Sequence, residues 1–380
     1  MKKDIYITAL HLAHGGVEMA ISLMSNAFVK KGYNVTILSI YNLGKPAYKI
    51  LPEVKIEYLT DVRPNKEEFS NAVKNKNPFE ILRQGLYSLK VLRLKKTAIV
   101  KKFKEIGDGI IISTRNEHSV LLSKYGNGNV LKIAQLHHDH CFDKRLLSDI
   151  KNRYLNIDYF TLLTDSLTAE IKELIKEKNK HTRCVTMENF LDATDFNVDF
   201  GKKEKIVIAV GRLHKVKGFD RLLKIWSETV KKHPDWKLYI AGDGEEKESL
   251  IKTARESGVA DSVVFTGALS HEDVLDTMKK ASVYAMTSYS EGFPFVLIEA
   301  MSCGLPAVAF DVRVGPRAII NDGKNGILVD DGNLDAFDGA LCRLAGNSEL
   351  RLNYGKNALE RAEDFTEEKT VQKWIALFNN

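Results

Sequence analysis

Two glutamates, Glu291 and Glu299, stand eight positions apart in the stretch SYSEGFPFVLIEAMSCGLP. Pro294 and Gly304 predict a helix over about residues 294–303, because proline suits a first helical turn and glycine ends helices. Free N–H groups at the start of such a helix can bind phosphate, and carboxylates can bind hydroxyl groups. The spacing therefore indicates a sugar-nucleotide site. A capped helix with two incidental surface acids is the alternative.

A basic pair, Arg212 and Lys217, lies in the loop GRLHKVKGF directly after a predicted buried strand. A guanidinium and an ammonium group at a strand end can neutralise a diphosphate. The alternative is that they are two of the 56 lysines and arginines of the chain that happen to lie near a turn. Together with the two glutamates, they indicate that one loop cluster binds both the phosphates and the sugar of a nucleotide sugar.

Alternating strand and helix patterns must position these residues. The first predicted strand, Ile5–Leu10, is followed by the glycine-rich loop HLAHGGVE, a helix with regularly spaced apolar residues, and the strand NVTILSI. The pattern restarts at Lys205 with KIVIAV, and further strands follow in WKLYIAG, SVVFTG, VYAMTS and PAVAF. The fold class that we expect is α/β, with two Rossmann-like domains.

The domain limits that we expect are 1–190 and 191–365, with a hinge in the linker near residues 187–200. The last helical stretch, Glu367–Phe378, could cover either domain, and residues 366–380 could pack back on the first.

Composition is that of an ordinary soluble protein, with 44% apolar and 28% charged residues and a net charge of +6. No apolar run reaches the roughly 18 residues of a membrane-spanning helix, and we expect no signal peptide. The four cysteines are widely spaced, which favours a reducing cytoplasm.

The stretch Lys90–Lys104 carries seven lysines or arginines and no acid. It predicts peripheral contact with an anionic membrane, or else a solvated helix face packed on its own domain.

The motifs GRLxxxKGF, AGDGEE, VxFTG and SxxEGFPxxxxEAMxxGLPAVA together resemble glycosyltransferase family 4, which has the GT-B fold. The glutamate pair matches the E-x7-E motif of that family. The similarity is strong over residues 205–330 and weaker over the first 190, where HGGVE and QLHHDH fall at the places the family uses. The resemblance implies two domains facing across a cleft. The first would bind the acceptor and the second the nucleotide sugar.

The resemblance also implies a role for each matching position. Arg212 and Lys217 would bind the donor diphosphate and stabilise the leaving group, and Glu299 would bind the donor ribose. Glu291 would hold the hydroxyls of the donor sugar, together with the backbone of Gly292, Phe293 and Pro294. In the first domain, a glycine loop would lie under the diphosphate and the acceptor; its residues are Gly15 and Gly16. Glycine at these two positions is also expected on physical grounds alone, because a side chain would block the close approach of a ligand to the backbone.

The stretch AQLHHDHCF is ambiguous. Its three histidines and one aspartate invite a metal interpretation, although ligands so closely spaced rarely converge on one ion. His137 follows a predicted strand, and the family places a histidine there, near the donor sugar; His138 is the alternative. The chain contains no Asp-x-Asp motif, which fits a transferase that requires no metal or other cofactor. Leaving-group charge would then be neutralised by basic side chains and a helix N-terminus.

The reaction implied by the resemblance retains anomeric configuration. The acceptor hydroxyl would attack on the face that the nucleotide leaves, and Glu291 would orient the sugar; its use as a glycosidase-type nucleophile is the alternative. We expect a UDP-linked hexose or N-acetylhexosamine as donor and a glycan or lipid-linked acceptor in cell-surface polysaccharide biosynthesis. Other candidates are a soluble small-molecule or protein acceptor, and a non-catalytic nucleotide-sugar-binding partner subunit. We expect no nucleic-acid partner. An NAD-dependent enzyme is disfavoured, because ALHLAHGGVE is not G-x-G-x-x-G.

Overall fold

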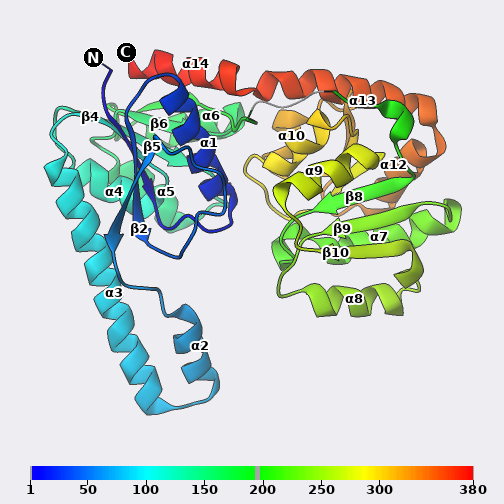
Figure 1. Ribbon diagram of the computed structural model, residues 1–380, viewed down its shortest axis with the longest axis horizontal. Coiled ribbons are helices and arrows are strands. Elements are labelled where there is room, and N and C mark those ends of the chain that lie inside the picture. The colour runs from blue at the N-terminus through cyan, green and yellow to red at the C-terminus, as the bar shows by residue number, and fades with distance from the viewer. Residues whose placement is uncertain (1, 193–196, 380) are drawn as a thin grey trace. The chain divides into compact units, whose positions relative to one another are not determined.

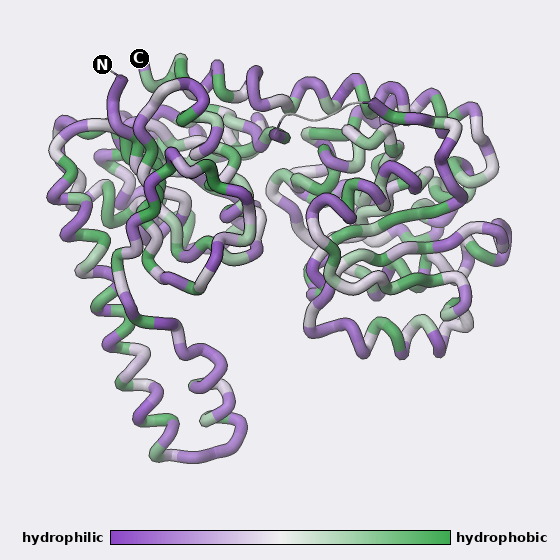
Figure 2. Tube along the Cα trace, viewed as in Figure 1, coloured by the Kyte–Doolittle hydropathy of each residue, from purple (hydrophilic) through white to green (hydrophobic). Residues whose placement is uncertain are grey.

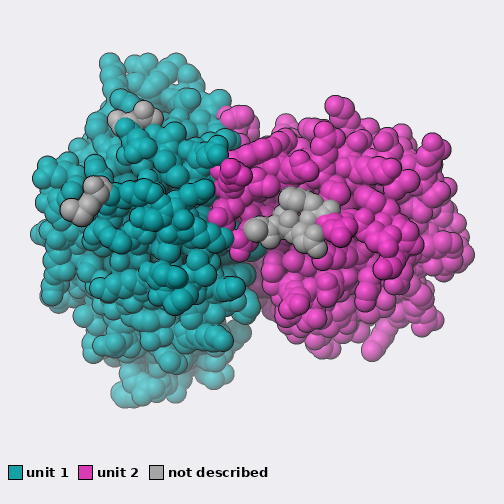
Figure 3. Space-filling model, turned by 45° about the horizontal axis from the view of Figure 1, so that its top comes forward, with its two compact units in different colours: residues 1–162, 168–187, 371–380 teal, residues 163–167, 188–370 magenta. Residues whose placement is uncertain are grey.

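The computed structural model describes residues 2–192 and 197–379, and the chain forms two compact units (Figure 3). The first unit comprises Met1–Leu162, Thr168–Met187 and Val371–Asn380, and the second comprises Leu163–Leu167 and Glu188–Thr370. Each unit is built on one parallel sheet covered by helices, which is the Rossmann-like architecture expected from the alternating pattern (Figure 1).

The first unit contains seven strands in the order β3-β2-β1-β4-β5-β6-β7, all parallel. Their bounds are β1 Ile5–Ala9, β2 Val35–Tyr41, β3 Lys55–Thr60, β4 Gly109–Ser113, β5 Val130–Leu136, β6 Tyr159–Leu162 and β7 Arg183–Thr186. The central strands are short apolar runs, and β4 (GIIIS) is buried at every residue. Such runs are typical of parallel strands that are covered on both faces.

The helices of the first unit are α1 Gly16–Lys30, α2 Lys66–Lys74, α3 Pro78–Glu105, α4 Asn116–Tyr125, α5 Lys144–Arg153 and α6 Asp165–Ile175. The last helix, α14 Glu367–Phe378, packs on α1. Its Trp374 and Phe378 rings meet the Phe28 ring edge-on, with centroids 5.9 and 5.2 Å apart. Burial of these rings holds residues 371–380 on the first unit.

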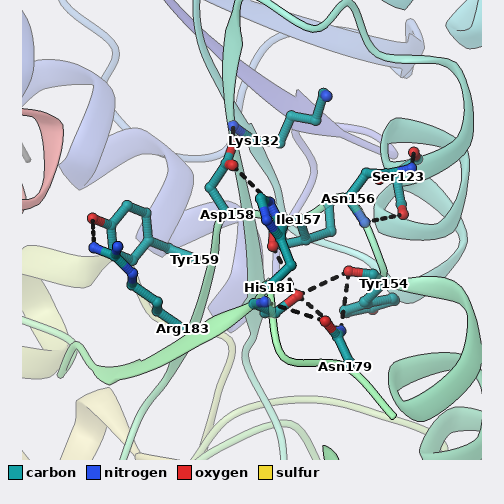
Figure 4. Close-up of polar contacts among 11 residues, drawn as sticks. Ser123, Lys132, Tyr154, Asn156, Ile157, Asp158, Tyr159, Asn179, His181 and Arg183 are labelled. Atoms are coloured by element: carbon teal, nitrogen blue, oxygen red, sulfur yellow. Dashed lines mark hydrogen bonds and ion pairs between the residues drawn. The ribbon is translucent and has the colours of Figure 1, made fainter.

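A polar network ties the amino ends of strands β5, β6 and β7 together (Figure 4). The Asp158 carboxylate accepts a hydrogen bond from the Lys132 N–H at 2.8 Å and contacts His181 Nε2 at 2.9 Å. Nearby, Asn179 Nδ2 donates to the Tyr154 carbonyl at 3.2 Å. This network lies at the sheet edge opposite to the carboxyl ends of the strands, so its role is to hold the strands together.

The second unit contains six parallel strands in the order β10-β9-β8-β11-β12-β13. Their bounds are β8 Ile206–Val210, β9 Lys237–Ala241, β10 Val263–Gly267, β11 Val283–Met286, β12 Ala307–Asp311 and β13 Gly326–Asp330. The helices are α7 Phe219–Lys232, α8 Lys247–Glu256, α9 His271–Lys280, α10 Phe295–Ser302, α11 Pro316–Ile319, α12 Leu334–Gly346 and α13 Ser348–Ala362. Short 3-10 turns lie at Phe200–Lys202, Lys215–Lys217, Ala260–Ser262 and Glu363–Phe365. Trp226, Trp236 and Phe310 lie in its apolar core.

Strand order reverses once in each sheet, between β1 and β4 in the first unit and between β8 and β11 in the second. At such a switch point the loops after the two strands leave toward opposite sides, which is where open α/β sheets bind ligands. The loops after β1, β8 and β11 carry the glycine pair, the basic pair and Glu291, so the topology puts these residues at the switch points. His137 follows β5, one strand further along the first sheet.

The start of α10 differs from the sequence-based prediction, and the expected hinge lies partly outside the described residues. Helix α10 begins at Phe295 rather than 294, because Pro294 has an extended ψ of 113° and occupies the N-cap position. The expected hinge near residues 187–200 includes residues 193–196, which lie outside the described residues, and it stays a prediction. Within the described ranges, no helix is both long enough and apolar enough to cross a bilayer.

Candidate active site

The loop after β8 is fitted closely onto the segment after β11. Gly218, which ends the 3-10 turn Lys215–Lys217, has a φ of 65°. A Cβ there would lie 2.0 Å from the Thr287 carbonyl oxygen, so only glycine fits. The Thr287 hydroxyl donates to the Gly218 carbonyl at 2.9 Å. This packing fixes Lys217 against the turn that carries Glu291.

Lys217 and Glu291 form an ion pair, although 74 positions separate them in the sequence. The Lys217 Nζ lies 2.7 Å from Glu291 Oε1, and the Ser288 hydroxyl donates to the same oxygen at 2.6 Å. The Glu291 side chain is only 9% exposed, whereas that of Lys217 is 26% exposed. The structure thus joins two residues that were assigned to different parts of the donor.

Arg212 is exposed, and no hydrogen bond or ion pair joins its side chain to another residue of the described ranges. Its loop is nevertheless anchored, because the Leu213 N–H donates to the Asp243 carbonyl at 2.9 Å. Gly242, with a φ of 146°, lies directly against the Gly211 carbonyl, where a Cβ would come within 2.0 Å. The guanidinium is therefore mounted on a fixed loop and is available to an anion.

Glu299 lies on α10 and is 4% exposed. Burial raises the pKa of this carboxyl from 4.5 to about 7, because the apolar surroundings disfavour the charged form. The His271 Nδ1 lies 3.7 Å from Glu299 Oε1, and burial lowers the pKa of this imidazole, which favours the neutral ring. Near neutral pH the group can therefore either accept a hydrogen bond or donate one, as binding of a sugar hydroxyl requires.

The Gly292-Phe293-Pro294 turn is held from several sides. The Asn189 amide donates to the Phe293 carbonyl at 3.0 Å, and the Phe293 ring meets Phe365 edge-on at 5.4 Å. These contacts fix the backbone that precedes α10.

Arg221 is a positioning residue that the sequence analysis missed. It is buried in the first turn of α7, and its guanidinium donates to the carbonyls of Thr287 and Ser288. The same group is stacked 4.1 Å from the ring centroids of both Tyr289 and Phe310. Arg221 thereby holds the segment that leads to Glu291. The sequence signal was faint, namely a cation inside an otherwise apolar helical face.

In the first unit, the glycine loop is shaped by a buried acid. A Cβ on Gly15 would lie 2.0 Å from Glu18 Oε2, whereas nothing lies within 4 Å of a Cβ on Gly16. Glu18 is buried, and its Oε1 is 3.4 Å from Arg115 Nη2 and 3.6 Å from His11 Nδ1. The sequence analysis did not predict a role for Glu18, Arg115 or His11. Of the three, only Glu18 lies within the motif HGGVE that the analysis singled out.

His137 directly follows β5, and its Nε2 is buried without a hydrogen-bond partner. Burial, followed by the nearby His138 and Arg115, lowers the pKa of the imidazole to about 3. A neutral ring with an unsatisfied nitrogen suits a hydrogen bond to a ligand. His138 is exposed, and partial burial lowers its pKa as well.

The two other side chains of the HHDH stretch serve the loop itself. Asp139 accepts from the Cys141 N–H at 3.1 Å, and His140 Nδ1 accepts from the Phe142 N–H at 3.0 Å. His140 Nε2 lies 3.0 Å from Glu170. Among residues 2–192 and 197–379, no group of three or more His, Cys, Asp and Glu side chains gathers as a metal site. The metal interpretation of this stretch therefore has no support in the geometry.

Comparisons with known proteins show the family and the fold. Residues 192–361 match the family described as Glycosyl transferases group 1. The amylovoran biosynthesis glycosyltransferase AmsD of Erwinia amylovora is 32% identical over 96% of this chain and 96% of its own length. An uncharacterised glycosyltransferase of Haemophilus influenzae is 31% identical over 95% of each chain.

A solved structure has the same fold. The pneumococcal O-GlcNAc transferase GtfA, in complex with UDP and GlcNAc, superposes with a TM-score of 0.78 over 99% of both chains at 15% identity. The two parallel-sheet units are thus those of the GT-B fold. Because two glycosyltransferases are more than 30% identical to it over nearly the whole of both chains, this chain belongs to the group 1 glycosyltransferases.

Proposed function

We propose that the chain is a retaining hexosyltransferase that moves a hexose or N-acetylhexosamine from a UDP-linked donor to a glycan or lipid-linked acceptor in cell-surface polysaccharide biosynthesis. The observation that carries this proposal is the 2.7 Å contact between Lys217 and Glu291 at the β8/β11 switch point. A cation suited to a diphosphate and a carboxylate suited to sugar hydroxyls stand there side by side.

Donor binding would rearrange this pair. Without donor, Glu291 neutralises Lys217. A diphosphate competes for the ammonium group, and Glu291 then remains with Ser288 to orient the sugar hydroxyls. The unpartnered guanidinium of Arg212 adds a second charge for the phosphates, and Glu299 binds the ribose.

Transfer with retention requires the bonds to change on one face of the sugar. The acceptor oxygen bonds to the anomeric carbon while the bond from that carbon to the phosphate oxygen breaks. The acceptor proton passes to the departing phosphate. Arg212 and Lys217 stabilise the developing negative charge, so in this proposal the residues of the chain meet the electrostatic demand without a metal ion or another cofactor.

We assign acceptor binding to the first unit. The buried nitrogen of His137 without a partner would take a hydrogen bond from the reacting sugars, and the loop of Gly15 and Gly16 leaves space for them. A lipid-linked acceptor would also require contact with a membrane surface, for which the basic stretch 90–104 is the sequence signal.

The choice of donor and acceptor is supported by what related proteins are named for. UDP occupies the pneumococcal structure, and AmsD is named for amylovoran biosynthesis. GtfA is named as an O-GlcNAc transferase, which keeps a protein acceptor as the second candidate. We also assign the reaction to the cytoplasm, a compartment that the widely spaced cysteines favour.

Release of free nucleotide from UDP-, GDP- and ADP-sugars by the purified protein in EDTA tests the proposal. One preferred UDP-sugar, with turnover unchanged by EDTA and lost in Glu291→Gln, is the expected result. Turnover that needs an added divalent cation would overturn the metal-free mechanism. A covalent sugar on Glu291 by mass spectrometry would overturn the same-face attack.

A further inference from the structure

Exposed apolar side chains gather on one part of the first unit, the hairpin formed by α2 and α3 (residues 66–96). Within the described ranges, fifteen large apolar residues are exposed, and nine of them lie between Phe69 and Leu94. Figure 1 shows the N-terminal half of α3 extending away from the sheet with α2 beside it, and Figure 2 shows apolar residues recurring along it. Such a concentration marks an interaction surface.

Four of these residues form a single stripe along α3. Phe79, Leu82, Leu86 and Leu89 recur at i, i+3, i+7 and i+10, which places them on one helical face. Their exposed fractions are 72%, 64%, 59% and 64%.

The stripe is exposed because α2 packs on a different face of α3. Asn65, at the N-cap of α2, hydrogen-bonds to Gln84 and Ser88, and the Phe69 ring lies 3.7 Å from the Cβ position of Gly85. Gln84 and Ser88 lie on the side of α3 away from the stripe, and Gly85 lies at the border of the stripe.

Cations accompany the stripe toward the C-terminal half of the helix. Lys90, Arg93 and Lys96 are exposed and have no acidic partner in the described part of the chain. The stripe and these cations together extend over about 26 Å of helix.

Four other residues of the basic stretch 90–104 contact the rest of the first unit. Lys95 and Lys102 pair with Glu117 and Glu57, and the apolar Ile99 and Phe103 are buried. The four apolar residues of the stripe, Phe79 to Leu89, therefore lie N-terminal to the stretch 90–104, of which Leu92 and Leu94 are also exposed.

We infer that this stripe, Phe79 to Leu89 with Lys90, Arg93 and Lys96, docks on an anionic membrane surface, with α3 lying along the headgroup layer. The charges select the partner. A second copy of the chain would bring like charges together, whereas anionic lipids supply the opposite charge and hydrocarbon for the leucines. Docking is independent of the transferase chemistry, so the two proposals can fail separately.

Vesicle co-sedimentation without donor or acceptor tests the inference. We expect binding to phosphatidylcholine vesicles that contain about 30 mol% phosphatidylglycerol, and little binding to phosphatidylcholine alone. Leu82→Ser/Leu86→Ser/Leu89→Ser should lower the partition coefficient by about tenfold or more, since the transfer of three leucines is lost. Lys90→Gln/Arg93→Gln/Lys96→Gln should remove most of the dependence on anionic lipid.

Control variants at other sites show whether vesicle binding depends on the stripe itself or on any exposed leucine or lysine of the protein. Leu155→Ser/Leu352→Ser changes exposed leucines elsewhere, and Lys224→Gln/Lys252→Gln/Lys356→Gln removes three exposed lysines of the second unit. Both should bind vesicles as the wild type does. Because Trp226, Trp236 and Trp374 are buried, Phe79→Trp gives a reporter whose emission should shift to the blue on binding.

Three outcomes of the lipid experiments would overturn the inference. They are the absence of lipid-dependent binding at moderate salt, full binding by the triple serine variant, and no blue shift of the reporter. A dimer in sedimentation velocity without lipid that the triple serine variant abolishes would assign the stripe to a second copy and also overturn it. An unchanged midpoint of urea unfolding in the triple serine variant, followed by fluorescence of the buried tryptophans, would show that the variant is folded.

Discussion

Glu299→Gln should stabilise the protein at alkaline pH and leave its stability unchanged at acid pH. The carboxyl is buried in α10, and its pKa rises from 4.5 to about 7 because the charged form is desolvated. Below pH 4.5 the group is neutral in both the folded and the unfolded chain. As the pH rises to about 7, the unfolded chain ionises first, and stability is lost.

The size of the change in stability follows from the pKa values of Glu299 in the unfolded and the folded chain. A rise from 4.5 to about 7 corresponds to about 3 kcal/mol, at 1.36 kcal/mol per pH unit. Glutamine has nearly the same shape and no charge. The difference in free energy of unfolding between Glu299→Gln and wild type should therefore grow from near zero at acid pH to about 3 kcal/mol above pH 7.

Urea unfolding over a pH series measures this difference, with fluorescence of Trp226 and Trp236 reporting on the second unit. Glu349→Gln, at an exposed carboxyl, gives the reference for the substitution itself. A difference between Glu299→Gln and wild type that stays constant with pH would refute the reasoning, because the buried carboxyl would then carry no ionisation penalty.

The same group links pH to donor binding. A ribose hydroxyl that donates to Glu299 favours the ionised carboxylate, so donor affinity should rise as the pH increases through about 7. In Glu299→Gln the donor affinity should be lower and should lose this part of its pH dependence. Calorimetry with UDP at several pH values measures both.

Three further predictions concern the supports of the site and the last helix. Gly218→Ala should lower the free energy of unfolding by more than Gly258→Ala, because both glycines have a φ near 65° but only Gly218 lies against a carbonyl, and the two urea midpoints give the difference. Arg221→Lys should lower kcat more than it raises KM for the donor, because lysine cannot reproduce the stacked, forked contacts that hold the Glu291 segment; an unchanged kcat would contradict this. Trp374→Ala should cost about 3–5 kcal/mol in thermal unfolding, since it removes a buried ring from the contact with α1, whereas Leu352→Ala at an exposed site should cost little.

The strands and the switch-point loops could be predicted from the sequence because their signals are local. Apolar runs such as GIIIS mark buried parallel strands, and Gly304 (φ 68°) ends α10 as its position indicated. The start of α10 was off by one residue, because the chain before it is held in an extended conformation by the contacts of Phe293.

Pairings between distant residues could not be predicted in this way. The Lys217–Glu291 pair depends on how closely Gly218 lets two loops approach, and no local pattern encodes that distance. The sequence analysis did not single out Arg221, which is buried between two aromatic rings that lie far from it in the sequence. Charge alone likewise singled out residues 90–104, whereas Ile99 and Phe103 are buried there and the stripe from Phe79 to Leu89 lies nearer the start of α3.

Calorimetric binding of UDP to wild type, Lys217→Gln and Lys215→Gln tests the central claim most directly. Lys215 is an exposed lysine of the same loop and is the matched control for charge. The account predicts that Lys217→Gln weakens UDP binding by about tenfold or more, since a charge-assisted bond to phosphate is lost, and that Lys215→Gln binds as wild type. Equal binding by all three proteins would contradict it, because the diphosphate would then not bind at the β8/β11 switch point.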